Sequence, residues 1–306
     1  MRHLPCHNHP RGELPQLILH ALKNGTPHHR GVTRPRHFRK GCHYVSKPQE
    51  FERVALVASD VEAAQEACRA LSAEHDWAPL EEADAVVVLG GDGFMLQTLH
   101  AMLDSGRVIP AYGMNLGTVG FLMNRFRSGS NPLRRLAKAK SIAVAPLQME
   151  ATTQDGKTHR FCAINEVSLL RETRQTAKIE VSVDDKVRIA ELVCDGVLLS
   201  TPAGSTAYNL SANGPILPLG SELLALTPIS PFRPRRWRGA ILPDRSRIKF
   251  TVIEPKKRPV SAVADQKELR DIAEVSLEIA RESQLTLLFD PGHALDERIV
   301  AEQFVV

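Results

Sequence analysis

The sequence predicts two domains: an α/β N-terminal domain with a doubly wound sheet, followed by an all-β C-terminal domain. Over residues 51–140, short apolar runs alternate with helical patterns, which is how parallel sheets covered by helices are built. From residue 141 onward the apolar residues recur with a period of two, and turn-forming pairs separate the runs. A chain of 306 residues is long enough to bury two cores of ordinary size.

The α/β domain, residues 51–140, is expected to consist of strand–helix units. In the first helix the apolar residues recur at helical spacing, and Ser59 or Asp60 is expected to cap it. The third strand leads into a glycine-spaced turn, residues 115–122, at the end of a strand where ligands of open α/β sheets bind. The expected strands are residues 51–58, 85–89 and 108–114, and the expected helices are residues 61–74, 94–103 and 132–138.

The β-rich domain, residues 141–290, is expected to contain short strands separated by turns such as Asp155-Gly156 and Asp184-Asp185. A helix over residues 296–303, in the C-terminal segment 291–306, could return to the first domain. The expected strands are residues 142–153, 158–162, 167–170, 177–183, 187–193, 197–201, 246–253, 260–264, 274–279 and 285–289.

Composition predicts a soluble, cytoplasmic protein. Apolar residues make up 43% of the chain and charged residues 24%, and no apolar run approaches the roughly 20 residues that span a bilayer. The five cysteines are scattered and form no Cys-x-x-Cys pair, which fits a reducing compartment and no structural zinc.

The net charge of +4 comes from a basic N-terminal tail, residues 1–50. The tail holds nine Lys and Arg against two acidic residues, and subtracting these from the totals of 39 and 35 leaves 30 basic against 33 acidic groups in the body. We therefore expect no nucleic-acid partner. Because the tail has many prolines and little periodicity, we expect it to be disordered; a targeting peptide is the alternative. The spacing of Cys6, His7, His9, Cys42 and His43 matches no standard metal site.

The turn Gly90-Gly91-Asp92-Gly93 is the strongest candidate for chemistry in the first domain. A buried strand precedes it and a helix follows, so its glycines and the helix N-terminus could approach a phosphate. Asp92 would repel that phosphate unless a metal or a hydroxyl losing its proton lies beside it, which favours phosphoryl transfer over simple nucleotide binding. A plain turn with Asp92 as helix N-cap is the alternative.

Three polar groups stand out in the β-rich domain. They are Asn165-Glu166 at a strand end, Cys194-Asp195-Gly196, and the loop 201–216, which gathers small residues, hydroxyls and one tyrosine. Singly, turn formation or helix capping would explain them, but their joint presence indicates a ligand site.

Together these motifs resemble the NAD kinase family, and most of all its alphaproteobacterial branch, over residues 51–306. The resemblance implies the NAD kinase/diacylglycerol kinase-like fold, with a Rossmann-like first domain. It implies transfer of the γ-phosphoryl group of ATP to the 2′-hydroxyl of the adenosine ribose of NAD, with Mg²⁺, giving NADP. It also implies a homodimer or homotetramer, with NAD between the two domains and no membrane partner.

The resemblance also implies roles for individual residues. Asp92 matches the proton acceptor, and Gly93 lies beside it at the substrate. Asn165 and Glu166 match the pair that grips the adenosine ribose hydroxyls and the metal-phosphate region, and Asp195 matches an acid near the nicotinamide end. The loop around the bases corresponds to Ala203, Thr206, Ala207, Tyr208, Asn209, Leu210 and Ser211, with Tyr208 stacking on adenine.

The chain departs from the family pattern at two positions. Phe94 stands where many relatives have threonine, and Phe232 replaces a common histidine. Contacts that basic residues make near Thr176 and Val193 in some relatives are not expected here. Near Phe232, the arginines of residues 233–238 form either a solvated or subunit-facing loop, or a contact with ATP phosphates or a neighbouring subunit.

Two alternatives remain open from the sequence. A lipid kinase of the diacylglycerol or sphingosine type shares the glycine turn, but the chain lacks an obvious amphipathic membrane helix. A non-catalytic NAD(H) sensor would keep the site without turnover. Phosphofructokinases share only the turn. The sequence does not decide between NAD and NADH, or between ATP and polyphosphate.

Overall fold

The computed structural model describes residues 50–117 and 120–291. Its described residues divide into two compact units: unit 1 comprises residues 50–143 and 285–291, and unit 2 comprises residues 144–284. The predicted disordered tail and the predicted helix over residues 296–303 lie outside the described residues. No helix in the described part of the chain is long and apolar enough to cross a membrane.

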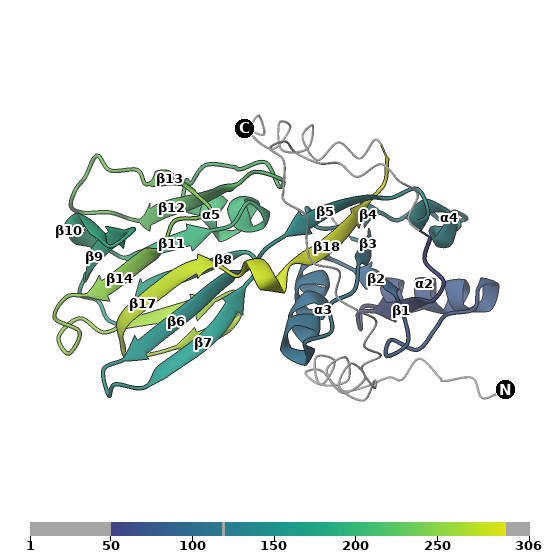
Figure 1. Ribbon diagram of the computed structural model, residues 1–306, viewed down its shortest axis with the longest axis horizontal. Helices are drawn as coiled ribbons and strands as arrows, with labels where there is room; N and C mark the ends of the chain where they lie inside the picture. The colour runs from purple at the N-terminus through teal and green to yellow at the C-terminus, as the bar shows by residue number, and fades with distance from the viewer. Residues whose placement is uncertain (1–49, 118–119, 292–306) are drawn as a thin grey trace. The chain divides into compact units, whose positions relative to one another are not determined.

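Unit 1 is built on a sheet whose central strands are parallel (Figure 1). The strand order is β1-β2-β3-β18-β5, and β4 pairs with the C-terminal end of β3. Every residue of β2 and β3 is buried, as expected for parallel strands covered on both faces. The strands are β1 (Val54–Ala58), β2 (Ala85–Gly90), β3 (Ala111–Asn115), β4 (Asn124–Arg125), β5 (Lys140–Val144) and β18 (Leu285–Phe289).

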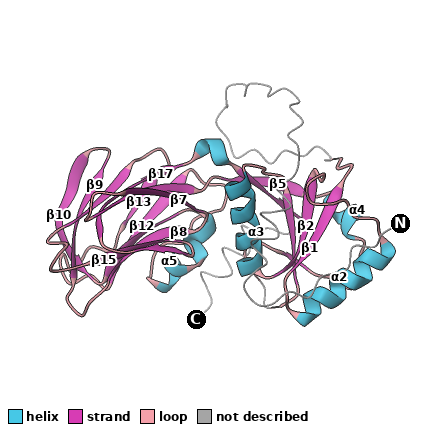
Figure 2. Cartoon of the chain, turned by 90° about the horizontal axis from the view of Figure 1, so that it is seen from below, coloured by secondary structure: helices cyan, strands magenta, loops and turns pink. Residues whose placement is uncertain are grey.

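Helices α2 (Glu62–Glu74) and α3 (Asp92–Ser105) cover opposite faces of this sheet (Figure 2). The predicted apolar stripe of α2 is confirmed, since its members are the buried residues of that helix. The predicted cap is wrong: Val61 is the N-cap residue and no side chain caps it. Helix α4 (Pro132–Leu136) is capped by Asn131, whose side chain accepts a hydrogen bond from the Arg134 N–H.

Unit 2 consists of two six-stranded antiparallel sheets around one apolar core (Figure 1). The strand orders are β10-β9-β14-β17-β6-β7 and β13-β12-β11-β8-β15-β16. Met149 and Phe250 from the first sheet and Leu169 and Val197 from the second belong to the same buried cluster. The strands are β6 (Leu147–Thr153), β7 (Thr158–Ala163), β8 (Glu166–Arg171), β9 (Ala177–Val183), β10 (Lys186–Cys194), β11 (Gly196–Ser200), β12 (Leu223–Ile229), β13 (Ala240–Pro243), β14 (Ile248–Val252), β15 (Val260–Ala264), β16 (Lys267–Leu269) and β17 (Ile272–Ile279).

Two strand predictions for this region need correction. The predicted strand over residues 142–153 is two strands, because β5 joins the sheet of unit 1 and β6 begins after Pro146 in unit 2. The strand at residues 285–289 was expected in the β-rich domain, but β18 pairs with β3 in unit 1. Strands β12, β13 and β16 were not predicted, and in β12 the proline at position 228 weakens the strand pattern.

Candidate functional site

The glycine turn of unit 1 connects β2 to α3 with Asp92 as the first residue of the helix. Gly91 is the N-cap residue and no side chain caps the helix, so the interpretation of Asp92 as a mere N-cap is wrong. Gly90 is tightly enclosed, because an added Cβ would lie 3.1 Å from Phe94 and 3.2 Å from the Ser59 hydroxyl. Gly93 is exposed and has open space around its Cα.

The Asp92 carboxylate is held by the loop that follows β3. The backbone N–H of Phe121 donates to Oδ2 at 2.6 Å, and the N–H of Leu122 donates to Oδ1 at 3.1 Å. The loop approaches so closely that a Cβ on Gly120 would lie 2.1 Å from Oδ1. A carboxylate offers about four acceptor sites, so Asp92 can accept a substrate hydroxyl alongside these two donors.

Other polar groups collect at the same carboxyl edge of the sheet. Ser59 follows β1, and its buried hydroxyl has no hydrogen-bond partner in the part of the chain that the structure describes. Asn115 ends β3, and its side chain accepts the N–H of Gly117 at 2.7 Å. The carboxyl ends of parallel strands are where ligands of such sheets bind, so this edge is the candidate site of unit 1.

In unit 2, Asn165 and Glu166 lie where the chain crosses from β7 in one sheet to β8 in the other. Their backbone is fixed by Asp265 on one side and by Thr201 on the other. Within residues 50–117 and 120–291, Asn165 Oδ1 and Glu166 Oε2 are nevertheless buried without a hydrogen-bond partner. A buried polar atom without a partner costs about 1–3 kcal/mol, which makes these two oxygens candidate contacts for a ligand.

Burial raises the pKa of Glu166 to about 8, the largest cause being loss of solvent. The negative charge of Asp265 raises this pKa further, whereas a hydrogen bond from the Tyr208 backbone lowers it. In the ligand-free protein at neutral pH the Glu166 carboxyl therefore holds a proton. It can then donate a hydrogen bond as well as accept one.

The loop after β11 packs directly on the Asn165 backbone. The Thr201 hydroxyl donates to the carbonyl of Ile164 at 2.7 Å, and a Cβ on Gly204 would lie 2.2 Å from the Asn165 carbonyl. Only a glycine fits at position 204, so this glycine is what allows the loop to pack against the backbone of the β7–β8 crossing. The loop contains a 3₁₀ turn, η1 (Ala203–Thr206), and one turn of α-helix, α5 (Tyr208–Ser211).

The predicted base-binding residues of this loop differ in exposure. Asn209 is fully buried, and its amide donates to the carbonyls of Ser205 (3.1 Å) and Pro215 (2.8 Å) and accepts the Thr227 hydroxyl (2.7 Å). Asn209 therefore shapes the loop from within. Ala203 is buried too, Ser211 is exposed, and the half-buried members are Thr206, Ala207, Tyr208 and Leu210.

Asp195 lies at the opposite end of the β8–β11 ladder from Glu166. Ser200 pairs with Glu166 and Gly196 with Leu170, so the ends are separated by four residues, or about 14 Å. The pKa of the Tyr208 phenol is raised first by burial and then by the charges of both Glu166 and Asp195. Tyr208 therefore lies within electrostatic reach of both acids.

Arg171 holds the Asp195 carboxylate in place. Its Nε lies 2.6 Å from Asp195 Oδ1, and its backbone N–H donates to the Asp195 carbonyl at 3.0 Å. Both side chains are about one-third exposed, so the pair is accessible to a ligand.

The arginine run of residues 233–238 lies between β12 and β13 and presents its guanidinium groups to solvent. Arg233 and Arg235 lie over the exposed ring of Phe232, at 5.6 and 5.1 Å from its centroid. Trp237 packs against the core and anchors the loop. These observations fit both interpretations made from the sequence.

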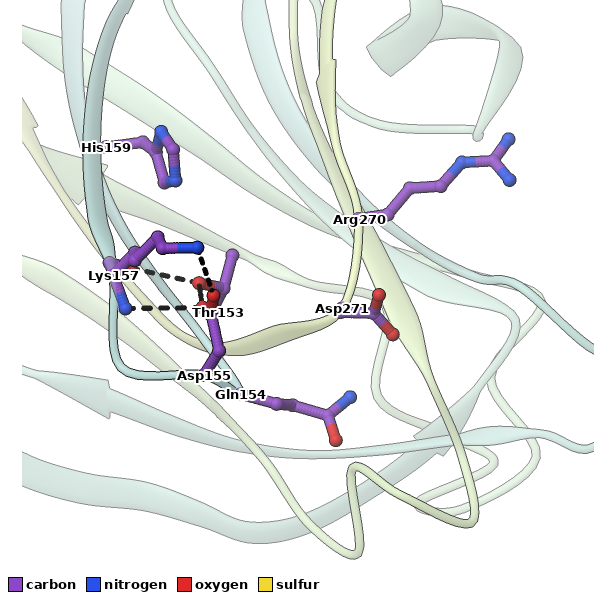
Figure 3. A pocket seen from close by; sticks show the side chains of 7 residues that line it. All are labelled: Thr153, Gln154, Asp155, Lys157, His159, Arg270 and Asp271. Carbon is purple, nitrogen blue, oxygen red and sulfur yellow. Dashed lines mark hydrogen bonds and ion pairs between the residues drawn. The ribbon is translucent and has the colours of Figure 1, made fainter.

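A separate depression of about 440 Å³ lies at the β6–β7 hairpin of unit 2 (Figure 3). Lys157 is paired with Asp155 at 2.7 Å, and the guanidinium of Arg270 points away from that pair (Figure 3). None of the predicted site residues lines it. The lining residues are Thr153, Gln154, Asp155, Lys157, His159, Arg270 and Asp271.

Across residues 50–117 and 120–291, no group of three or more His, Cys, Asp or Glu side chains could hold a metal ion. Mg²⁺ is commonly bound by one or two protein oxygens together with substrate phosphates and water. The partnerless oxygens of Asn165 and Glu166 and the carboxylate of Asp92 are hard ligands of that kind. Each unit by itself therefore offers oxygen donors of the kind that a Mg²⁺ ion bound to nucleotide phosphates accepts.

Two family models match the chain: the ATP-NAD kinase N-terminal domain over residues 42–131 and the ATP-NAD kinase C-terminal domain over residues 164–285. The chain is 65% identical to an NAD kinase of Rhizorhabdus wittichii over 255 residues, which cover 83% of this chain and 99% of that relative. It is 61% identical to an NAD kinase of Zymomonas mobilis over 255 residues, covering 83% and 98%. The chain belongs to the NAD kinase family.

The family assignment made from the sequence motifs is confirmed, including its alphaproteobacterial character. The fold resembles that of yeast NADH kinase complexed with NADH, with a TM-score of 0.71 at 21% identity over 85% of this chain and 92% of that chain. At this identity the likeness concerns the fold alone, and it confirms the predicted combination of an α/β and a β-rich part. Membership of the NAD kinase family makes the chain a phosphotransferase whose relatives are NAD kinases, and this removes the lipid-kinase alternative.

Sequence reasoning missed two residues that hold the NAD kinase motifs in place. Asp265 grips the backbone of Asn165 and Glu166, and Gly120 makes room for the Asp92 carboxylate. Gly120 lies in the glycine-spaced turn, so that pattern contained a signal. Asp265 is followed by glutamine in a short turn between two strands, where an aspartate indicates only a turn.

Proposed function

We propose that this protein phosphorylates the 2′-hydroxyl of the adenosine ribose of NAD with ATP and Mg²⁺, giving NADP, and that Asp92 accepts the proton. The observation that carries the catalytic assignment is the Asp92 carboxylate, held by two backbone N–H groups at the carboxyl edge of a parallel sheet. Membership of the NAD kinase family supports the substrates.

In the proposed reaction the 2′-oxygen attacks the γ-phosphorus of ATP, the bond from that phosphorus to the β,γ-bridging oxygen breaks, and ADP leaves. The proton of the 2′-hydroxyl passes to Asp92. Because phosphoryl transfer has a loose transition state, the proton can leave late and a carboxylate suffices as its acceptor. Mg²⁺ on the phosphates would neutralise charge on the transferring group. The N–H groups of Phe121 and Leu122 keep the carboxylate aimed at one position.

NAD is proposed to lie between the two units, so that residues from both act on one substrate. Asn165 and Glu166 would bind the ribose hydroxyls with the oxygens that lack a partner among the described residues. Tyr208 would stack on adenine, and Asp195 would serve the nicotinamide end. The separation of Asp195 from Glu166 along the β8–β11 ladder supports a ligand as extended as a dinucleotide.

Three wider features belong to the same proposal. The enzyme is a homodimer or homotetramer, which light scattering of the purified protein would test. It is cytoplasmic, in keeping with cysteines at positions 68, 162 and 194 that form no disulfide. The arginines of residues 233–238 then serve either a subunit contact or the phosphates of ATP.

A coupled assay tests the proposed function. Purified protein is incubated with Mg-ATP and NAD or NADH, and NADP(H) is read out by a dehydrogenase specific for it. Phosphorus NMR of the product distinguishes a 2′-phosphate from a phosphate at another hydroxyl. NADP formation that requires both substrates is the expected result. A protein that binds NAD but forms no NADP would be a sensor, and the proposal would fail.

A further inference from the structure

Asp265 lies in the turn between β15 and β16, outside every motif that pointed to the site. Its φ of 51° is in the left-handed region that residues other than glycine rarely adopt. Its backbone N–H donates to the Glu166 carbonyl at 3.1 Å, which attaches the turn to the start of β8. The conformation directs its carboxylate to the crossing between β7 and β8.

The carboxylate accepts hydrogen bonds from three consecutive backbone N–H groups of that crossing. Ile164 donates to Oδ2 at 2.7 Å, while Asn165 and Glu166 donate to Oδ1 at 3.0 and 3.1 Å. On the other side, Thr201 donates to the carbonyls of Ile164 and Asn165. Hydrogen bonds to a carboxylate are among the stronger ones in proteins, so Asp265 contributes much of what fixes the backbone of this crossing.

We propose that Asp265 is a positioning residue for NAD binding, which holds Asn165 and Glu166 in the orientation that the adenosine ribose requires. This inference rests on the proposed function. Both side chains keep an oxygen that no group in the described part of the chain satisfies, so the hydrogen bonds to their backbone would hold those oxygens in place for a ligand. An ordinary turn residue would stabilise the fold without affecting NAD affinity.

Asp184 provides a matched control within the same unit. It lies in the turn between β9 and β10 with the same φ of 51°, and its carboxylate accepts the Arg247 N–H at 3.0 Å. Its own N–H donates to the Arg247 carbonyl at 2.9 Å. The conformation and the kind of hydrogen bond are those of Asp265, but β9 and β10 belong to the sheet that does not contain β8.

The experiment compares Asp265→Asn with Asp184→Asn. Asparagine keeps one acceptor oxygen but turns N–H donors toward a backbone that also donates. The measurements are kcat, KM for NAD and for Mg-ATP, Kd for NAD by calorimetry, and Tm. For Asp265→Asn we expect KM and Kd for NAD to rise about tenfold, as for a lost charge-assisted hydrogen bond, with KM for Mg-ATP nearly unchanged. Asp184→Asn should lower Tm and leave NAD affinity unchanged.

Unchanged KM and Kd for NAD in Asp265→Asn, or an equal rise in Asp184→Asn, would overturn the inference. If Asp265→Asn does not fold, Asp265→Glu is the second variant, since it keeps the carboxylate but displaces it by one methylene. We expect it to raise KM for NAD by less than the tenfold expected for Asp265→Asn. An unchanged KM for NAD in Asp265→Glu would overturn the inference. A wild-type protein that makes no NADP refutes the proposed function. A wild-type protein that makes NADP, with unchanged NAD affinity in the variant, refutes only the role of Asp265.

Discussion

The Asp92 carboxylate accepts two backbone N–H groups, and these hydrogen bonds fix its direction. In a loose phosphoryl transfer, positioning contributes more to the rate than proton affinity does. Under the proposed function, Asp92 would therefore act as an oriented acceptor of the proton.

Replacing Asp92 by asparagine tests this role. We expect Asp92→Asn to keep NAD affinity within a few-fold but to lose about 10²- to 10⁴-fold in kcat, the range for a missing proton acceptor. Asp184→Asn is the control for the same chemical change elsewhere, and its kcat should equal that of wild type. Steady-state kinetics with NAD titrations would measure both. Wild-type kcat in Asp92→Asn would show that another group accepts the proton.

Glu166 should make the stability of the ligand-free protein depend on pH. Its pKa is raised from 4.5 to about 8 in the folded protein, so between these values the folded state binds a proton that the unfolded state does not. Stability contributed by the protonated carboxyl is therefore present at pH 5 and is lost as pH rises through about 8. We expect the Tm difference between wild type and Glu166→Gln to change over this window. A constant difference from pH 5 to 9 would mean that Glu166 is already ionised.

At the scale of elements, the proposed positioning of Asp92 depends on the close fit of the loop after β3 against the first turn of α3. Gly120→Ala tests this fit, since the added Cβ would lie 2.1 Å from Asp92 Oδ1 and must displace the carboxylate. We expect kcat to fall by at least tenfold, because displacement by even about 1 Å can cost two orders of magnitude. Kinetic assays and Tm would be compared for the variant and wild type.

Gly117→Ala is the matched control for this change in the same loop. Its Cβ would meet nothing closer than the Asn115 Oδ1 at 3.8 Å, which is ordinary contact distance. We expect it to keep most of the activity. Equal losses in both variants would indicate a general effect of stiffening the loop, and the fit around Asp92 would then lose its support.

Elements with a strong local pattern could be predicted from the sequence, whereas their partners could not. The run before Gly90 is β-branched and apolar, so both β2 and the turn into α3 were predictable. Residues 285–289 were predicted as a strand, β18, but assigned to the wrong sheet. An apolar run predicts a strand, but it does not indicate which strands will pair with it. β12 carries Pro228 inside the ladder and so lost its strand signal.

The candidate site follows the same division. Asn165, Glu166 and Asp92 stood out in the sequence because polar residues at strand ends and glycine turns are unusual, and their roles stay predictions. Asp265 is about a hundred residues from the crossing it grips, and its positive φ cannot be read from the sequence. Asn209 was placed in the base-binding loop by resemblance, and nothing in the sequence indicated that its amide bonds the loop's own backbone.

At the scale of the whole molecule, the sequence of unit 2 is inserted between two strands of unit 1. The chain leaves that sheet through β5 and returns through β18, which lies between β5 and β3. β18 contributes Leu287, Leu288 and Phe289, all at most 2% exposed. Burying each such side chain stabilises the fold by about 1.5–3 kcal/mol, a large share of the roughly 5–15 kcal/mol of a whole domain. The polar side chain of Asn124 also bonds to this strand, donating to the Leu288 carbonyl at 2.9 Å.

Unit 1 should therefore not fold from its N-terminal part alone. We expect a fragment of residues 50–143 to lack cooperative thermal unfolding, because its sheet would have a gap between β3 and β5. The same fragment joined through a flexible linker to residues 285–291 should recover it. A linker of about ten residues is long enough, since the Ala280 N–H bonds to the Pro146 carbonyl and so brings the two crossing points together. Circular dichroism melts would measure both fragments, and cooperative unfolding of residues 50–143 alone would show that β18 is dispensable.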